Sequence, residues 1–285
     1  MTNYELIDSE DALEAACKHF AQQAVICVDT EFFREVTYYP QLALVQIACG
    51  ERTVCIDPLV IDNIQPLLDL LLNPDVLKVL HSSGQDMEVF HCSYNILPTP
   101  VFDTQIAANK LGYGDQLSYA ALIKQCLDID VDKSQTRTNW LQRPLSQRQL
   151  EYAANDVIYL AQCFPIIHQQ LKEQNLLKEL NGAFSDISHP QRFEVPYEKM
   201  WRKVKGHRHL PREEQVLLKS LAAWREKEAQ KIDRPRRHTL SDEGLIEIVK
   251  QRPQDREQLL GLPALKRYGI LDESVNELLE CLQSN

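Results

Sequence analysis

The sequence predicts an α/β domain, a mixed sheet flanked by helices, followed by a small all-α bundle. Three observations predict it: strand-length apolar runs crowd the first 57 residues, apolar runs and helical patterns alternate up to about residue 180, and only helical patterns follow residue 210. Strands that are first adjacent and then separated by helices are typical of a mixed sheet with helices on its faces.

The N-terminal segment supplies most of the expected strands. These are short apolar or alternating runs, namely YELID from Tyr4, VICVDTEF from Val25, LALVQIAC from Leu42 and TVCIDP from Thr53. Between the first two, SEDALEAACKHF from Ser9 has helical spacing and an acidic first turn, which favours a helix.

Helices and strands alternate after Asp57. We expect, in order, a leucine-rich helix ending at Leu72, a strand VLKVLH ending at His81, a helix from Gly84 to about His91, a short strand VFD from Val101 and a mainly helical region to about Leu180. This alternation extends the sheet and supplies the helices that cover it.

The pattern changes at about residue 182. Gly182, Pro190 and Pro196 lie in a stretch without a sustained apolar period, which is typical of a linker. Helical patterns then begin near Leu210, Ser241 and Ile270. We therefore expect a domain over residues 1–181, a linker over 182–206 and a helical domain over 207–285.

The composition excludes wholesale disorder but leaves the partner open. The 285 residues are 44% hydrophobic and 25% charged, and 31 Lys and Arg against 41 Asp and Glu give a net charge of -10. Such acidity argues at first against a nucleic-acid partner. Residues 191–238, however, hold 14 Lys and Arg against 7 Asp and Glu, so a basic strip exists locally.

The N-terminal segment and the cysteines predict the compartment and the redox state of the protein. No signal peptide or membrane-length apolar run is visible, so we expect a soluble cytoplasmic protein with no membrane partner. The eight cysteines are scattered without a C-x-x-C pair, and we expect reduced, mostly buried thiols rather than a zinc site.

Asp29 and Glu31 stand within an otherwise apolar strand. Residues i and i+2 point to the same side of a sheet, about 6–7 Å apart along the strand. Two carboxylates so close repel each other unless they are protonated or bind cations, and Mg2+ or Mn2+ prefers oxygen ligands. The alternative is a strand end that emerges into solvent with both acids hydrated.

Two later segments add acids that are candidates either for metal binding or for a purely structural role. Asp86 follows the strand ending at His81 and falls in the first turn of a helix, where a carboxylate can also serve only to stabilise the helix N-terminus. Tyr152 and Asp156 lie four residues apart on another helix, so they share a face. A tyrosine beside a solvated aspartate is the alternative there.

Together, these motifs resemble the Tyr-bearing branch of the DEDD exonuclease superfamily: D-x-E in VDTEF, the aspartate of HSSGQDME and Y-x3-D in YAANDV, in that order. The surrounding TYYPQLALVQIA, VFDTQIAA and NWLQRPLSQRQLEYAANDVIYL resemble the ribonuclease D family, and LLKSLAAWREKEAQKIDRPRRHTLSDEGLIEI resembles an HRDC domain, a helical nucleic-acid-binding module. The resemblance implies a ribonuclease H-like sheet followed by an HRDC-like bundle.

The same resemblance implies a catalytic set of five residues. Asp29, Glu31, Asp86 and Asp156 would hold two divalent ions, Mg2+ or Mn2+ with other divalent ions open, and Tyr152 would orient the attacking water. The implied activity is 3'-to-5' exoribonuclease action that releases nucleoside 5'-monophosphates and trims tRNA 3' ends. The expected partners are tRNA precursors with single-stranded 3' ends, bound by a monomer.

RNA contacts outside the metal centre are expected at an aromatic residue and in the basic strip. Phe32 is a candidate for stacking on a base, with core packing as the alternative. The basic candidates are Arg202, Lys203, Lys205, Arg236 and Arg237. A solvated linker and helix face is the alternative for the strip. We expect Asp103 to be structural, and we do not expect a metal at His207 and His209.

Two departures from the family pattern and two rival functions stay open. Thr138, Asn139 and Trp140 stand where bacterial members tend to have S-D-W, and the sequence shows one HRDC-like domain where many bacterial members have two. The rivals are a DNA exonuclease of the proofreading type and a non-catalytic RNA-binding or scaffold protein. The intact set of five residues disfavours the second.

Overall fold

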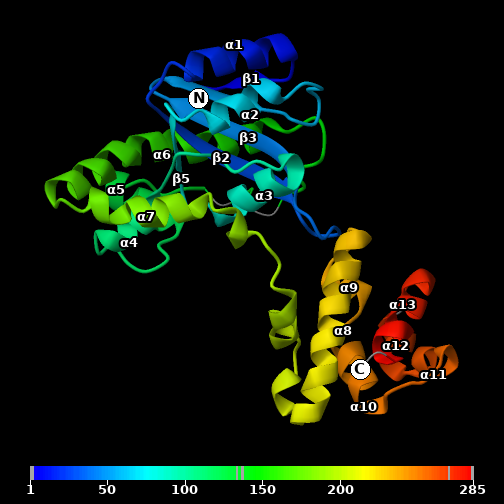
Figure 1. Cartoon of the computed structure of the whole chain (residues 1–285). Coiled ribbons are helices and arrows are strands. Elements are labelled where there is room, and N and C mark those ends of the chain that lie inside the picture. Colours follow the sequence, from blue (N-terminus) through cyan, green and yellow to red (C-terminus); the bar gives the residue numbers. More distant parts are fainter. Residues whose placement is uncertain (1–2, 133, 136–137, 269, 284–285) are drawn as a thin grey trace. The chain divides into compact units, whose positions relative to one another are not determined.

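The computed structural model describes residues 3–132, 134–135, 138–268 and 270–283, and the chain forms two compact units (Figure 1). The first unit runs to Phe33 and resumes over Pro40–Phe193, and the second comprises Arg34–Tyr39 and the chain from Glu194 onward. The expected domain ends at residues 1 and 285 lie outside the described residues.

The first unit contains a six-stranded mixed sheet in the order β1-β4-β3-β2-β5-β6. β2 pairs with β3 and β3 with β4 antiparallel, whereas β1–β4, β2–β5 and β5–β6 are parallel. The predicted mixed sheet is therefore confirmed. Its strands are β1 (Glu5–Ile7), β2 (Val25–Phe33), β3 (Gln41–Cys49), β4 (Arg52–Ile56), β5 (Leu77–Leu80) and β6 (Val101–Asp103).

Helices cover both faces of this sheet. They are α1 (Glu10–Phe20), α2 (Gln65–Leu72), α3 (Gly84–Tyr94), α4 (Thr104–Lys110), α5 (Tyr119–Leu127), α6 (Gln147–Glu173) and α7 (Leu177–Ile187). One apolar core joins α1, α2 and α3 to one face, and α6 closes two further cores on the other face. Between α5 and α6 the described residues form no helix, so the expected helical region is interrupted there.

The side chains of β2 alternate between these two faces. Ile26 and Val28 belong to the core under α1, α2 and α3, whereas Cys27 belongs to a core under α6. Because successive side chains of a strand point to opposite faces, Asp29 follows Cys27 onto the α6 face and Thr30 follows Val28 onto the α3 face.

The second unit is helical around its own core, as expected. Its elements are the 3-10 helices η2 (Tyr197–Lys203) and η3 (His207–His209) and the helices α8 (Arg212–Lys231), α9 (Arg236–Thr239), α10 (Asp242–Gln251), α11 (Arg256–Gly261), α12 (Pro263–Tyr268) and α13 (Asp272–Gln283). A short helix η1 (Pro190–Arg192) ends the first unit.

The segment 182–206 differs from the expected linker. Its first residues complete α7, and Ile187 is buried in the first unit's core. Met200 and Val204 are buried in the core of the second unit, so most of this segment is packed structure. Sequence pattern alone missed it because the apolar residues of 3-10 turns have no helical or strand period.

The loop Arg34–Tyr39, which joins β2 to β3, groups with the second unit. The hydroxyl of Tyr38 donates to Glu226 at 2.6 Å, and the Asp233 carboxylate accepts from the backbone N–H groups of Tyr38 and Tyr39, both at 3.0 Å. Tyr38 and Glu226 are both buried, so the loop is packed into the second unit at this point.

All eight cysteines are free thiols, and four of them are buried while the other four are half-buried, so fewer are buried than expected. Burial raises the pKa of the Cys55 thiol to about 12, which makes it a packing residue at neutral pH. Over the part of the chain that the structure describes, no helix has both the length and the apolarity needed to cross a membrane.

Candidate active site

The C-terminal end of β2 positions the first two acids. β5 pairs with β2 only over Val25–Cys27, so the strand continues past its parallel neighbour before it reaches Asp29 and Glu31. Both side chains lie on the α6 face and are half-buried. The register between β2 and β3 then shifts between Glu31 and Phe32, a β-bulge of the kind that re-aims a side chain.

α6 supplies the third acid. The helix begins with the predicted capping box, in which the Ser146 hydroxyl accepts from the Gln149 N–H and the Gln149 side chain accepts from the Ser146 N–H. This cap fixes the start of a 27-residue helix and thereby the height of Asp156 above the sheet. Asp156 is 8% exposed.

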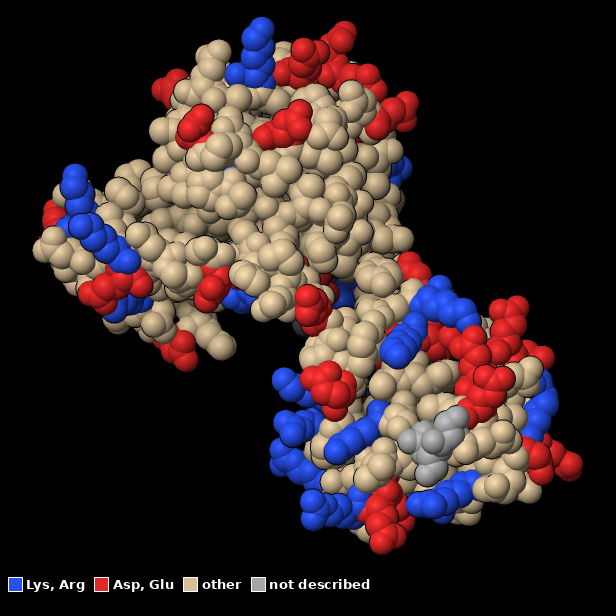
Figure 2. Space-filling model, in the orientation of Figure 1, with Lys and Arg blue, Asp and Glu red and all other residues tan. Residues whose placement is uncertain are grey.

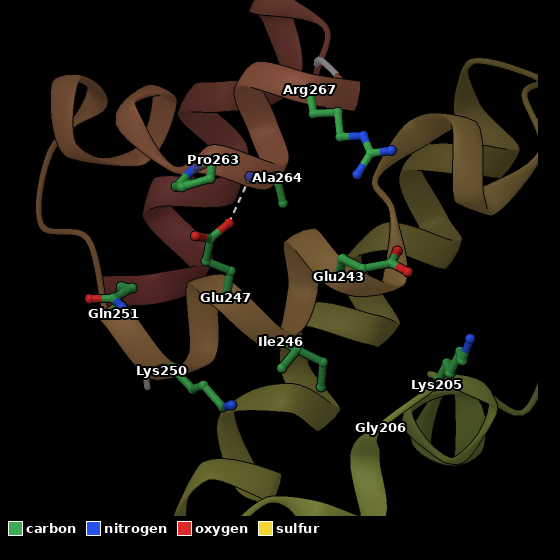
Figure 3. A pocket seen from close by; sticks show the side chains of 10 residues that line it. All are labelled: Lys205, Gly206, Glu243, Ile246, Glu247, Lys250, Gln251, Pro263, Ala264 and Arg267. Carbon is green, nitrogen blue, oxygen red and sulfur yellow. Dashed lines mark hydrogen bonds between the residues drawn. The ribbon is translucent and has the colours of Figure 1, made fainter.

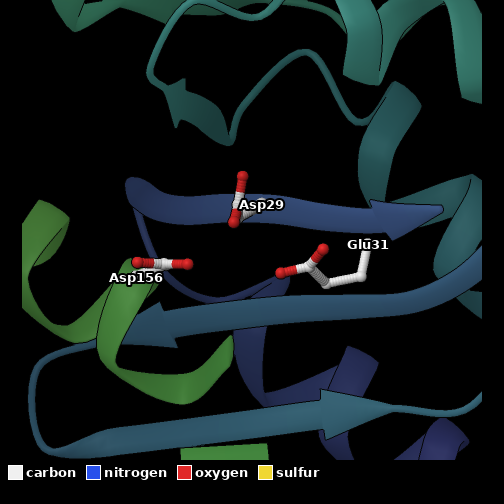
Figure 4. A group of neighbouring side chains, drawn as sticks. All are labelled: Asp29, Glu31 and Asp156. Atoms are coloured by element: carbon white, nitrogen blue, oxygen red, sulfur yellow. The ribbon is translucent and has the colours of Figure 1, made fainter. Parts of the chain in front are cut away.

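Asp29, Glu31 and Asp156 form one group (Figure 4). One carboxylate oxygen from each lies within 4.8 Å of the others. In the described residues this is the single group of three or more His, Cys, Asp or Glu side chains that is arranged to hold a metal ion. His207 and His209 lie outside this group.

The electrostatics of the group favour a cation. Burial, then the charges of Asp86, Asp156 and Glu31, raise the pKa of Asp29 well above its usual range. Burial and the neighbouring aspartates likewise raise the pKa of Glu31. Burial raises the pKa of Asp156 to about 7, although a hydrogen bond from Tyr152 opposes the shift. Divalent cations would remove this repulsion, and three oxygen donors suit Mg2+ or Mn2+.

Asp86 reaches the site from the other side of β2. It lies in the first turn of α3, and the Thr30 hydroxyl donates to its Oδ1 at 2.5 Å. It is not one of the three grouped acids, but its charge is the largest Coulombic contribution to the raised pKa of Asp29. Burial raises the pKa of Asp86 itself to about 7, against the opposing hydrogen bond from Thr30.

Tyr152 contacts one of the grouped acids, Asp156, directly. Its side chain hydrogen-bonds to Asp156, four residues further along α6, and its ring lies 6.2 Å from that of Trp140. All five sequence-predicted residues therefore lie at one site, three of them as a tight carboxylate group, with Tyr152 bonded to Asp156 and Asp86 bonded to Thr30.

A pocket of about 680 Å³ opens beside these acids. Asp29, Asp86 and Phe32 line it, together with neutral polar side chains such as Gln85, Gln105 and Gln116. Phe32 also packs against the neighbouring core, so stacking and packing are both available to it.

Sequence reasoning missed the supports of this pocket. The Tyr119 hydroxyl donates to the backbone carbonyl of Asp156 at 2.5 Å. His81 Nε2 and Gln105 Nε2 both bond to the carbonyl of Leu117, at 3.0 and 2.9 Å, and hold the segment that enters α5. These contacts join residues 12 to 37 positions apart, so no local pattern marks them.

Asp103 is structural, as expected. It caps α4 through the N–H groups of Gln105 and Ile106, and it also accepts from the N–H and hydroxyl groups of Ser83 and from the N–H of Ser82. It thus ties the end of β6 to the turn that precedes α3, and so helps to place Asp86.

The basic candidates of the second unit fall into two groups. Arg236 pairs with the buried Glu226 at 3.0 Å, and Arg237 pairs with the buried Asp242 at 3.2 Å. Arg202, Lys203 and Lys205 are exposed, and the described residues offer Lys203 and Lys205 no ion pair. The first pair is therefore engaged within the fold, whereas the second group faces solvent.

A second pocket, of about 650 Å³, lies beside Lys205 in this unit (Figure 3). Lys250 and Arg267 supply further cations to its lining, and Ile246 supplies an apolar wall. Glu247, also in the lining, is engaged by the N–H of Ala264 at 2.8 Å. Figure 2 shows Lys and Arg gathered along one side of this unit, consistent with the basic strip seen in the sequence.

Comparisons with known proteins indicate which family the chain belongs to. Residues 4–174 match the 3'-5' exonuclease family, and residues 214–282 match the HRDC domain. The ribonuclease D of Bartonella henselae is 39% identical over 264 residues, which cover 92% of this chain and 65% of that protein. The chain thus spans slightly less than two thirds of that relative.

Two solved structures are also similar. The crystal structure of Escherichia coli RNase D, described as an exoribonuclease involved in structured RNA processing, matches with a TM-score of 0.86 and 32% identity, covering 99% of this chain and 76% of that one. Brucella melitensis NrnC with bound Mg2+ matches with a TM-score of 0.55 and 26% identity, covering 66% of this chain and 90% of that one.

Proposed function

Because this chain belongs to the ribonuclease D family of 3'-5' exonucleases, we propose that it is a metal-dependent 3'-to-5' exoribonuclease that releases nucleoside 5'-monophosphates. The observation that carries the proposal is the group of three carboxylates within 4.8 Å, next to a tyrosine that bonds to one of them. Such a set has no evident structural use, because it places like charges together in a partly buried site.

Asp29, Glu31 and Asp156 would hold the metal, with Asp86 beside them. The four carboxylates carry about -4 when ionised, which two divalent ions would neutralise, so that a phosphate could approach. Bound divalent ions lower the pKa of water and stabilise charge on the oxygens of a phosphodiester. The Mg2+ in the related Brucella melitensis NrnC supports a divalent ion for this site; two ions, and Mg2+ or Mn2+ among them, are part of the proposal.

Tyr152 would position the attacking water. A phenol with a reference pKa of about 10 is a poor base at neutral pH, so its role is hydrogen bonding rather than proton abstraction. Its bond to Asp156 supports this role because it holds the hydroxyl at the edge of the carboxylate group.

RNA would be held at two places. Phe32 lines the pocket beside Asp29 and would stack on a base near the 3' end. Arg202, Lys203 and Lys205 would bind phosphates, and Lys250 and Arg267 add cations to a pocket that Glu243 and Glu247 also line. We include Arg236 and Arg237 as weaker contributors, since their ion pairs leave them less charge to offer. The proposed substrates are tRNA precursors with single-stranded 3' ends, and the proposed acting form is a monomer.

One experiment separates this function from its rivals. The protein is incubated with 5'-labelled RNA and with DNA of matching sequence, in Mg2+, Mn2+ or EDTA. We expect an RNA ladder that shortens from the 3' end with either metal and not with EDTA. Equal rates on DNA would favour the proofreading-type exonuclease, and no metal-dependent ladder on either substrate would favour a scaffold protein.

A further inference from the structure

Gln46 is a fully buried glutamine whose amide lacks partners. It lies in β3 with 0% of its surface exposed, and neither its Nε2 nor its Oε1 has a hydrogen-bonding partner among the described residues. Buried polar side chains in proteins are nearly always hydrogen-bonded, because burying an unpaired amide costs the lost interaction with water. An apolar side chain of similar size would suit a purely structural position better.

The position of Gln46 points to the metal centre. It pairs directly with Asp29 across β2 and β3 and with Cys55 across β3 and β4. Directly opposed residues of an antiparallel pair share a face, with Cβ atoms about 4.5–5.5 Å apart. Leu44, two residues away, is opposite Glu31 and packs in the core that α6 closes. Gln46 therefore shares the face of the three grouped acids.

A second side chain with an unpartnered polar atom lies at the same site. In the first unit, the buried side-chain atoms left without a partner among the described residues belong to Gln46 and Trp140. The Trp140 ring is the one that lies 6.2 Å from the ring of Tyr152. Unpaired polar groups that were mere packing defects would be scattered through the unit; these two are both neighbours of predicted catalytic residues.

We propose that Gln46 is a positioning residue of the metal centre. When divalent ions are held, its Nε2 would donate to a carboxylate oxygen of the grouped acids, and its Oε1 would accept from a water in the site. A neutral amide can do both without changing the balance between four carboxylates and two divalent ions, whereas a fifth acid or a lysine would disturb it. The inference rests on the proposed metal site.

The test measures metal binding without RNA. Gln46→Met removes the amide at similar volume, and Mn2+ binding to the metal-free protein is followed by titration calorimetry. We expect the Mn2+ dissociation constant to rise about tenfold or more, as for other groups that orient metal ligands. The Tm of the metal-free variant should be equal to or above that of the parent, because an unpaired buried amide has been removed.

Leu44→Met is the matched control. It alters the same strand and face opposite Glu31, conserves volume, and should leave the Mn2+ dissociation constant within twofold of the parent. A parental dissociation constant in Gln46→Met would overturn the inference.

A second readout covers a variant that packs poorly. The rise in Tm on adding Mn2+ is measured for each protein against its own metal-free Tm. A lower metal-free Tm with a parental Mn2+-induced rise would make Gln46 a packing residue and overturn the inference; a smaller rise supports it. If the parent itself binds no Mn2+, the proposed function fails instead, so the two failures are distinguishable.

Discussion

The hydroxyl of Thr30 donates a hydrogen bond of 2.5 Å to Oδ1 of Asp86, a residue 56 positions away. Thr30 stands between Asp29 and Glu31 in the strand, but it faces α3 while they face α6. One strand thus supplies two acids to one side and, through a hydroxyl, holds a third acid on the other. This bond also favours the ionised form of Asp86 and lowers its pKa against the effect of burial.

Thr30→Val should therefore raise the pKa of Asp86 in the metal-free protein. The pKa of Asp86 is about 7 with the bond in place, and loss of the bond raises it further. We expect a rise of about one pH unit, the size of one hydrogen bond to a charged group, in an NMR titration of the carboxyl carbons in EDTA. The equivalent change Thr53→Val, at a buried threonine of β4, should leave the pKa of Asp86 unchanged. An unchanged pKa of Asp86 in Thr30→Val would contradict the assignment.

Replacing a grouped acid should abolish turnover without unfolding the protein. For Asp29→Asn and for Asp156→Ala we expect at least about a thousandfold loss, because each removes a ligand charge. The Tm of metal-free Asp29→Asn should match or exceed the parental Tm at pH 8, since one source of like-charge repulsion is gone. Cleavage assays and thermal melts measure both effects. Parental turnover by Asp29→Asn would contradict the assignment of Asp29 to the active site.

Tyr152→Phe should lose most turnover but not all of it. The ring and its packing beside Trp140 remain, whereas the hydrogen bond to Asp156 is removed. We expect kcat to fall about a hundredfold with KM little changed, the range for a positioned group that assists the reacting water. Steady-state kinetics with a short RNA substrate measure kcat and KM separately. A fall confined to KM would instead make Tyr152 a substrate-binding residue.

The stability of the metal-free protein should fall as pH rises from about 4 to 8. The pKa values of Asp29, Glu31 and Asp156 are raised in the folded state, so the folded protein binds more protons than the unfolded chain in this window. Each such carboxyl lowers the free energy of unfolding by up to about 1.4 kcal/mol per pH unit over the range in which it is ionised in the unfolded chain but still protonated in the folded protein. Urea melts in EDTA measure the slope. Added Mg2+ should flatten it, and a metal-free stability that increased over this range would contradict the electrostatic account.

The exposed basic residues should govern the salt dependence of RNA binding. Neutralising Lys203 and Lys205 should reduce the slope of log affinity against log salt by about 0.7 for each phosphate that a lysine no longer neutralises, while short oligomers are still cleaved. Binding titrations from about 50 to 200 mM salt measure this slope. An unchanged slope in the double lysine variant would mean that the RNA binds elsewhere.

Arg236→Ala should lower the Tm, because it leaves the buried Glu226 with one partner fewer. Thermal melts measure this effect.

Much of the site could be predicted from local pattern. The two-residue period of a strand put Asp29 and Glu31 on one side, and helical spacing put Tyr152 beside Asp156. The Ser146 capping box was likewise visible as Ser-x-x-Gln. The boundaries of the expected linker were less successful, because Met200 and Val204 are buried by partners distant in the sequence.

By itself, then, the sequence determined the order of the strands and of most helices and the family, and it predicted the acids and the tyrosine of the candidate site, since strand and helix periods and motif spacing are local properties. Only the tertiary structure decided that Gln46 is opposite Asp29 and that Thr30 holds Asp86. It also decided that buried acids pair with Arg236 and Arg237, and that the loop Arg34–Tyr39 belongs to the second unit. These relationships depend on strand register and on packing between distant segments, which are settled by the burial and charge balance of the whole unit.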